Sequence, residues 1–77
     1  MKNQIYTNAK ALLKNQAREI KNSSKDKGYI RQELNNNLDQ VIYQINHYAM
    51  RETISQKHAD LYALWLANYT CYLHPKN

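Results

Sequence analysis

Residues 30–48 read IRQELNNNLDQVIYQINHY, and their apolar side chains recur at helical spacing. Steps of four, four, three, four and three residues separate the positions Ile30, Leu34, Leu38, Val41, Ile45 and Tyr48. Such spacing places all of them on one face of an α-helix, as in the seam of a coiled coil. A helix with a continuous apolar face has to bury that face against other helices. This stretch therefore predicts an all-α fold.

Two further helices are expected on either side of this one. Gly28 and Pro75 are the only glycine and proline in the chain, far fewer than a β-rich chain of this length would carry. A helix over residues 3–21 would place one band of side chains on the same face: Ile5, Ala9, Leu12, Leu13, Gln16 and Ile20. We predict helices over about 3–21, 28–51 and 56–73, packed as a small three-helix bundle in one domain.

The first loop is expected at residues 22–27, where NSSKDK is rich in turn formers. Ser23 or Ser24 is predicted to cap the second helix, because a serine hydroxyl accepts hydrogen bonds from the free N–H groups of a helix start. The third helix is expected to end before Pro75, because proline disfavours helical geometry at the residue that precedes it.

The second boundary is harder to place, because neither glycine nor proline marks it. Thr53 and Gln56 have the spacing of a capping box, which predicts a short turn over residues 52–55. The alternative is one continuous helix over residues 29–73. That helix would leave its apolar stripe exposed unless two copies paired, so we favour the break.

The chain is short for an independently stable fold. Folding of 77 residues buries roughly 60% of the surface of the extended chain, so the stability of one copy is expected to be marginal. One cysteine cannot close a disulfide within the chain, and no four-ligand zinc spacing occurs. Self-association is the remaining way for so small a chain to gain stability, and we expect a homodimer.

A helix over residues 56–73 would be apolar around most of its circumference, and two neighbouring helices cannot cover so wide a surface. One row on it consists of Leu61, Trp65, Tyr69 and Tyr72. Tyr62, Leu66 and Leu73 lie beside that row, and small residues, Cys71 among them, occupy much of the rest. We expect a second copy of the chain to cover the row, with Cys71 as a packing residue.

A second row lies off the seam of the helix over 28–51. Tyr43, His47 and Met50 follow one another at i, i+4 and i+7. The bundle core does not need them, and exposed aromatic and methionine side chains are enriched at protein interfaces. They are therefore assigned to the protein interface. The alternative is that they pack on their own chain.

The first helix carries the clearest charge pattern. Lys10, Lys14, Arg18 and Lys21 form a row opposite its apolar band, and residues 1–31 carry a net charge of +6 against −1 for residues 32–77. Such a row can follow a phosphate backbone. The alternative is a solvated face, which we favour because no aromatic residue interleaves the row. Nucleic-acid binding by a dimer that presents two basic helices is the second functional hypothesis.

Three other classes of site are not expected. ISQKHADL (54–61) has the character of the first helix of a helix-turn-helix, but residues 63–65 continue the helix where that motif needs a tight turn. Cys71 and His74 have a zinc-like spacing, yet nothing brings His47 and His58 to them. No nucleophile with an orienting acid is identifiable. We therefore predict a protein that is not an enzyme and binds no metal or cofactor.

The stretch DLYALWLANYTCYLHP (60–75) is interrupted by polar residues and falls short of the 20 or so apolar residues of a membrane span. No apolar signal segment is evident in MKNQIYTNAKALLKNQ, so a cytoplasmic location is expected. Asn, Lys, Tyr and Ile fill 31 of 77 positions, as in A/T-rich genomes. We favour a phage or mobile-element accessory protein that binds itself and a host protein.

Overall fold

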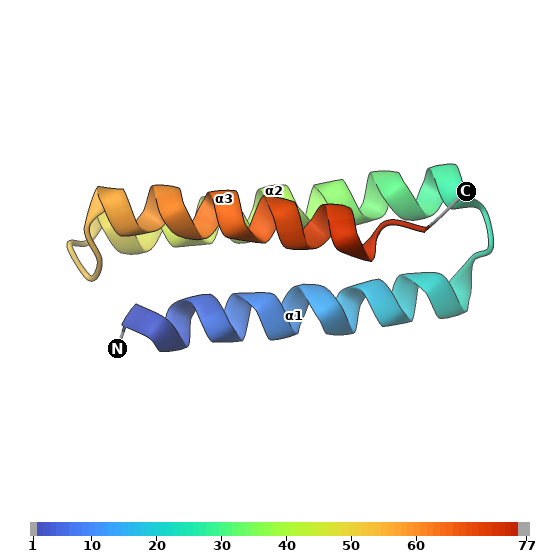
Figure 1. The fold of residues 1–77 in the computed structure, drawn as a ribbon, viewed down its shortest axis with the longest axis horizontal. Coiled ribbons are helices and arrows are strands. Elements are labelled where there is room, and N and C mark those ends of the chain that lie inside the picture. The colour runs from blue at the N-terminus through green and yellow to red at the C-terminus, as the bar shows by residue number, and fades with distance from the viewer. Residues whose placement is uncertain (1, 76–77) are drawn as a thin grey trace.

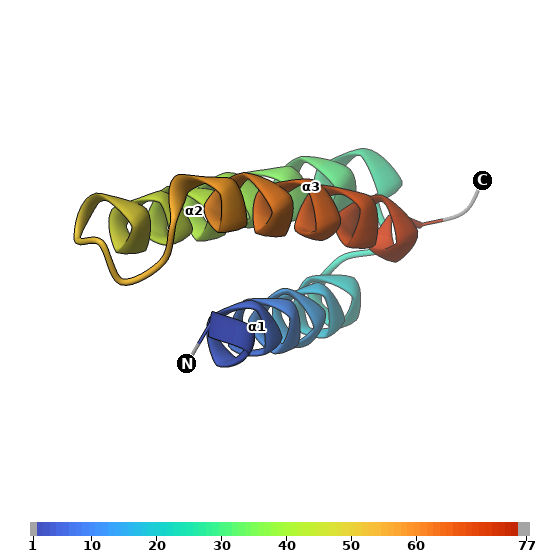
Figure 2. The same cartoon turned by 60° about the vertical axis from the view of Figure 1, so that its left-hand side comes forward.

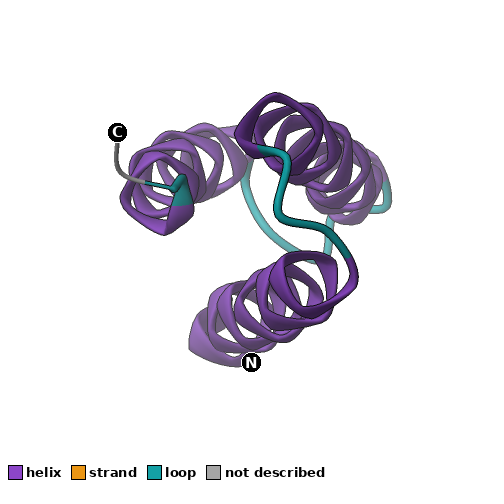
Figure 3. Cartoon of the chain, turned by 90° about the vertical axis from the view of Figure 1, so that its right-hand side faces the viewer, coloured by secondary structure: helices purple, strands orange, loops and turns teal. Residues whose placement is uncertain are grey.

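The computed structural model describes residues 2–75, which form three helices: α1 (Lys2–Ser23), α2 (Lys27–Met50) and α3 (Gln56–Leu73). α2 runs antiparallel to both α1 and α3, so α1 and α3 run in the same direction (Figure 1). Figure 2 shows α2 and α3 as a close pair above α1, and the three helices form a triangle when viewed end-on (Figure 3). The predicted all-α three-helix bundle is confirmed, with every helix end within two residues of its predicted place.

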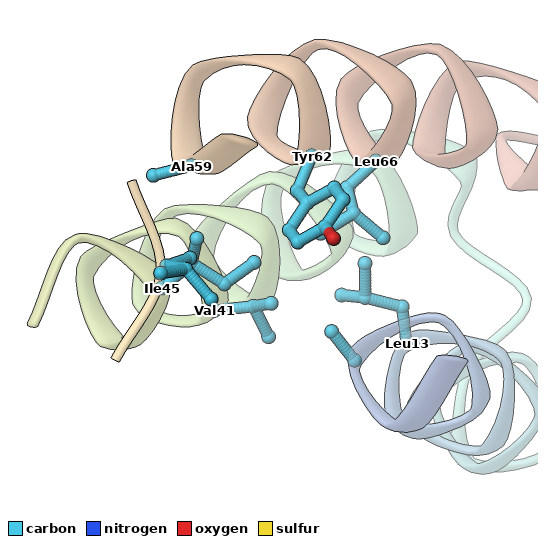
Figure 4. Close-up of a cluster of buried hydrophobic side chains, with 8 residues drawn as sticks. Leu13, Val41, Ile45, Ala59, Tyr62 and Leu66 are labelled. Carbon is cyan, nitrogen blue, oxygen red and sulfur yellow. The ribbon is translucent and has the colours of Figure 1, made fainter. Parts of the chain in front are cut away.

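The core runs along the axis of the bundle, which measures 40 × 16 × 16 Å. Its main cluster takes side chains from all three helices and from the α2–α3 turn: Ala9, Leu13, Val41, Ile45, Ile54, Ala59, Tyr62 and Leu66. In Figure 4, Leu13 points from α1 toward Leu66 and Tyr62 of α3. A smaller cluster joins Ala17 of α1 to Ile30 and Leu34 of α2.

The apolar seam of α2 is buried over most of its length. Ile30, Leu34, Val41 and Ile45 are all at most 4% exposed, as the spacing predicts. Leu38 is half-buried against the main cluster. Tyr48 departs from the prediction, since it is 41% exposed. It lies in the last turn of α2, where it lines a groove between α1 and α2 and does not reach the core.

The buried stripe of α1 differs from the predicted band at Leu12, which is exposed, and at Ala17, which is buried although the band did not include it. Ala9, Leu13 and Ala17 form the stripe, four residues apart, whereas Leu12 is 42% exposed. Alanine at both ends of the stripe allows the neighbouring helices to approach α1 closely. α1 is therefore rotated slightly from the orientation that its largest side chains favour, and the predicted burial of Leu12 was wrong.

The caps of α2 and α3 also correct the sequence prediction. Asp26, and neither Ser23 nor Ser24, caps α2: its Oδ1 accepts hydrogen bonds from the N–H groups of Gly28 (3.0 Å) and Tyr29 (3.5 Å). A carboxylate at this place also complements the positive end of the helix dipole. Ser55, and not Thr53, caps α3.

The Oγ of Ser55 accepts a hydrogen bond from the N–H of His58 at 3.1 Å, which is the usual N-cap geometry. The same Oγ lies 2.6 Å from Nδ1 of His58. Ser55 and His58 therefore both hold the start of α3.

The break between α2 and α3 is a Schellman motif that contains no glycine. The N–H of Thr53 donates to the carbonyl of Tyr48 (2.9 Å), and that of Glu52 donates to the carbonyl of Ala49 (3.0 Å). Glu52 has a φ of 61°, the left-handed conformation that the motif needs and that glycine usually supplies. The predicted turn over residues 52–55 is confirmed, and the single helix over 29–73 was wrong.

Replacement of Glu52 by glycine is expected to stabilise the bundle by about 1 kcal/mol, because glycine adopts a positive φ without steric cost. Urea unfolding followed by circular dichroism measures the change. Thr53→Gly is the matched control. The φ of Thr53 is not positive, so this substitution should not raise the free energy of unfolding. Equal stabilisation by both substitutions would contradict the assignment of strain to Glu52.

Candidate interaction surfaces

The first surface lies on the exposed side of α3. We call Leu61, Leu64 and Trp65 the outer strip of α3. Leu64 is 57% and Trp65 43% exposed, while Leu61 is half-buried. Residues 61–73 contain no charged side chain. An exposed helix face is ordinarily rich in charged residues, so this strip resembles the core of an interface.

Trp65 also anchors α3 to α1 through an aromatic cluster. Its ring meets that of Tyr6 edge-on, with ring centroids 5.5 Å apart. The centroid of the Tyr62 ring lies 5.6 Å from that of Tyr6 and 5.8 Å from that of Trp65. Edge-on and tilted pairs at these distances are favourable aromatic contacts. The sequence prediction missed Tyr6, because a helical wheel does not show which neighbour a side chain on the border of the apolar face will meet.

Tyr69 and Tyr72 form a second aromatic feature, the stacked pair, near the end of α3. Their rings are nearly parallel, at an angle of 16° with centroids 6.5 Å apart. Tyr69 is half-buried, whereas Tyr72 is 80% exposed. The Nζ of Lys10 lies 4.9 Å from the centre of the Tyr69 ring, a cation–π contact that joins α1 to the pair.

The cationic row of α1, Lys10, Lys14, Arg18 and Lys21, is exposed along its whole length. It spans about 16 Å at the rise of an α-helix. Glu19 lies between Arg18 and Lys21 in the sequence, but about 100° or more around the helix from each. Residues 2–18 contain no other carboxylate, and neither do residues 61–75 of the neighbouring helix. The row is therefore a strip of positive charge.

The structure changes one expectation about this row. From the sequence alone, no aromatic residue interleaves the four cations. In the folded chain, however, Tyr69 of α3 lies under Lys10, with Tyr72 stacked against it. Aromatic rings therefore do accompany the cationic row, supplied by a helix that is distant in sequence.

The predicted row on α2 lies on the outside of the bundle, separate from α3. Tyr43 and Met50 are 65% and 76% exposed, and the ring of His47 meets that of Tyr43 edge-on at 4.6 Å. Beside them, Gln44 lines three shallow hollows, one of which is the groove between α1 and α2. The structure thus places the predicted interface residues on two surfaces, one on α2 and one on α3, and does not bring them together.

Tyr29 lies near the start of α2. Its hydroxyl donates a hydrogen bond to Oε1 of Glu33 at 3.2 Å. The negative charge of Glu33 and this hydrogen bond raise the pKa of the Tyr29 hydroxyl. Tyr29 therefore interacts with its own helix.

Cys71 is exposed in a single copy of the chain, so it is not part of the bundle core, and its packing against a second copy stays a prediction. Its neighbour Thr70 takes the core-facing position instead and is 1% exposed. The Oγ1 of Thr70 has no hydrogen-bond partner, and neither has the buried Oε1 of Gln16. Among the residues that the structure describes, no three or more His, Cys, Asp or Glu side chains are grouped as metal ligands.

Two further sequence expectations concern α3 and membranes. α3 continues as a helix through residues 63–65, where a helix-turn-helix would need its turn. Over residues 2–75, no helix is both long enough and apolar enough to cross a membrane.

No protein-family model, curated protein or solved structure matches this chain. The features of the molecule that bear on its function are the outer strip of α3, the stacked pair, the cationic row and the α2 row.

Proposed function

We propose that this chain is a non-catalytic binding protein that pairs with a second copy of itself through the outer strip of α3. The observation that carries the proposal is the absence of charge in residues 61–73, although Leu64 is 57% and Trp65 43% exposed. Apolar surface of this kind gains free energy when a partner removes it from water.

A second copy suits this strip for an electrostatic reason. Each chain carries a net charge of +5, so two copies repel one another wherever their basic residues meet. The outer strip is a part of the surface where two copies can touch without bringing lysines or arginines together. Pairing also adds buried area to a bundle too small to bury much on its own.

The biological setting is a separate part of the proposal. The abundance of Asn, Lys, Tyr and Ile supports an origin in a phage or mobile element, whose accessory proteins act in the cytoplasm of the host. In that setting, the α2 row, with Tyr43 and Met50 exposed and His47 half-buried between them, is available to a host protein while α3 is covered. A pull-down from host cells, followed by mass spectrometry, would identify that protein.

Self-association is tested by sedimentation at micromolar protein concentrations. The wild-type chain should sediment as a dimer, and Leu64→Gln should weaken pairing by roughly tenfold or more, because a two-fold interface loses one leucine from each copy. Glutamine is a good helix former, so α3 should remain intact. Met50→Gln is the matched control: it replaces an exposed apolar residue of α2 and should leave the sedimenting mass unchanged.

Two results would contradict the proposal. One is a well-folded wild-type chain that remains a monomer at high micromolar concentration. The other is a dimer that Met50→Gln dissociates and Leu64→Gln does not, which would place the interface on α2.

A further inference from the structure

We propose that the cationic row of α1 and the stacked pair of α3 together bind single-stranded nucleic acid. This activity goes beyond self-association: it uses Tyr69 and Tyr72 near the end of α3, whereas the proposed pairing uses the outer strip, Leu61, Leu64 and Trp65, earlier in that helix. The row supplies contacts to phosphates, and the exposed ring of Tyr72 supplies a platform for a base.

The charge of this face is complementary to a polyanion. Lys10, Lys14, Arg18 and Lys21 are exposed at successive turns of α1 and extend over about 16 Å. Apart from Glu19, which points elsewhere, no carboxylate of α1 or of residues 61–75 competes for them. A strand that follows the row can therefore place successive phosphates beside successive cations and release their counterions.

The stacked pair places an aromatic surface beside this row. Tyr72 is 80% exposed, and its ring is held nearly parallel to that of Tyr69. Lys10 lies 4.9 Å from the centre of the Tyr69 ring, so phosphate and base contacts lie within the reach of one strand. A base that stacks on Tyr72 would extend an aromatic stack that is already in place. Aromatic platforms beside cationic grooves are the usual means of binding single strands without sequence preference.

Two features favour a single strand over other polyanions. The bases of a duplex are already stacked and paired, so a tyrosine ring beside the phosphates gains nothing from them. An anionic membrane, in turn, is bound by helices that insert leucine, phenylalanine or tryptophan next to their cations. Here the rings nearest the row are tyrosines, and the apolar stripe of α1 is buried in the bundle.

The binding experiment uses a fluorescently labelled oligothymidylate of about 20 nucleotides, read by anisotropy at several salt concentrations. The wild-type chain should bind it at low salt, with an affinity that falls steeply as salt rises. A duplex of the same length should bind about tenfold more weakly. Vesicles that contain phosphatidylserine, measured by co-sedimentation, should bind no protein at the salt concentration at which the oligonucleotide is held.

Charge-reversal variants locate the site. Lys14→Glu with Arg18→Glu should weaken binding by about tenfold or more and flatten the salt dependence. Arg51→Glu with Lys57→Glu makes the same change in net charge at two exposed positions on either side of the α2–α3 turn and should have a much smaller effect. Neither double variant should alter the sedimenting mass, so this inference and the proposed dimer can fail independently.

Substitution of Tyr72 tests the stacking contact. Tyr72→Ala should weaken binding on the order of tenfold, and Tyr72→Phe should retain it, because the ring and not the hydroxyl makes the contact. Both variants should keep the far-ultraviolet spectrum of the wild type. The inference is overturned if the oligonucleotide does not bind at low salt, if the duplex or the vesicles bind as well as the single strand, or if the two charge reversals have equal effects.

Discussion

Leu66→Ala is expected to lower the free energy of unfolding by about 2–5 kcal/mol. Leu66 is 0% exposed and belongs to the main core cluster, with Leu13 of α1 directed toward it (Figure 4). The substitution removes buried apolar atoms and leaves a cavity that helices packed on all sides cannot close. A chain of 77 residues typically has roughly 4–12 kcal/mol of stability, so this loss can unfold a large fraction of the molecules.

Leu64 is the matched control for Leu66. It lies on the same helix two residues earlier, yet it is 57% exposed. Leu64→Ala should change the stability of the monomer by no more than about 0.5 kcal/mol. Urea unfolding at a protein concentration low enough to separate any dimer distinguishes the two variants. Equal losses would show that the described burial of α3 is wrong.

Tyr62→Ala is expected to have the second large effect, a loss of about 3–5 kcal/mol. Tyr62 is 3% exposed and its ring contacts both Tyr6 of α1 and Trp65 of α3. Without this ring, α1 loses much of its aromatic contact with α3. Hydrogen exchange measures the result residue by residue, and protection in α1 should fall by several orders of magnitude, since a tenfold change corresponds to about 1.4 kcal/mol.

Tyr43→Ala is the comparison for this tyrosine. Tyr43 is 65% exposed on α2 and contacts the ring of its own neighbour His47. Its removal should leave protection in α1 unchanged. Stronger deprotection by Tyr43→Ala than by Tyr62→Ala would reverse the assigned roles of the two residues.

The sequence was sufficient to predict the helices, because their apolar residues recur with the period of an α-helix. The four-residue and three-residue steps from Ile30 to Ile45 place these side chains on one face, and that face is buried. The same reasoning failed at Leu12. The periodicity of α1 allows either Leu12 or its neighbour Leu13 to face the core. The burial of Ala9 and Ala17 against the other helices orients α1 so that Leu13 is buried and Leu12 is exposed.

The ends of the helices were less predictable, because several residue types can cap a helix. Ser23, Ser24 and Asp26 all have suitable side chains, and the choice depends on where the backbone leaves the helical conformation. Glu52 gives no sign in the sequence of its positive φ, which glycine or asparagine usually adopts. The Schellman motif at this turn is stabilised by backbone hydrogen bonds, which any sequence can form.

The candidate sites were predicted residue by residue but not as surfaces. The cationic row of α1 follows from spacing alone, because all four residues belong to one helix. Its proximity to Tyr69 depends on α1 and α3 running parallel and on which side of α2 each packs (Figure 3). With α1 and α3 exchanged between the two sides of α2, the bundle would bury the same apolar faces. The periodicity of the sequence therefore cannot distinguish these two arrangements. Only the packed chain shows which tyrosines meet which lysines.

The aromatic contact between α1 and α3 also supplies the protein with an optical reporter. Trp65 is the only tryptophan, and Tyr6 lies 5.5 Å from it although 59 positions separate them in the sequence. Light absorbed by Tyr6 can therefore pass to the indole while α1 is docked, in addition to light absorbed by Tyr62, which lies 5.8 Å from Trp65 on α3 itself. The ratio of indole emission after excitation of tyrosine to that after direct excitation should therefore rise by the contribution of Tyr6 when α1 docks, above a constant contribution from the tyrosines of α3. The change in this ratio thus reports the docking of α1 onto α3 without an attached label.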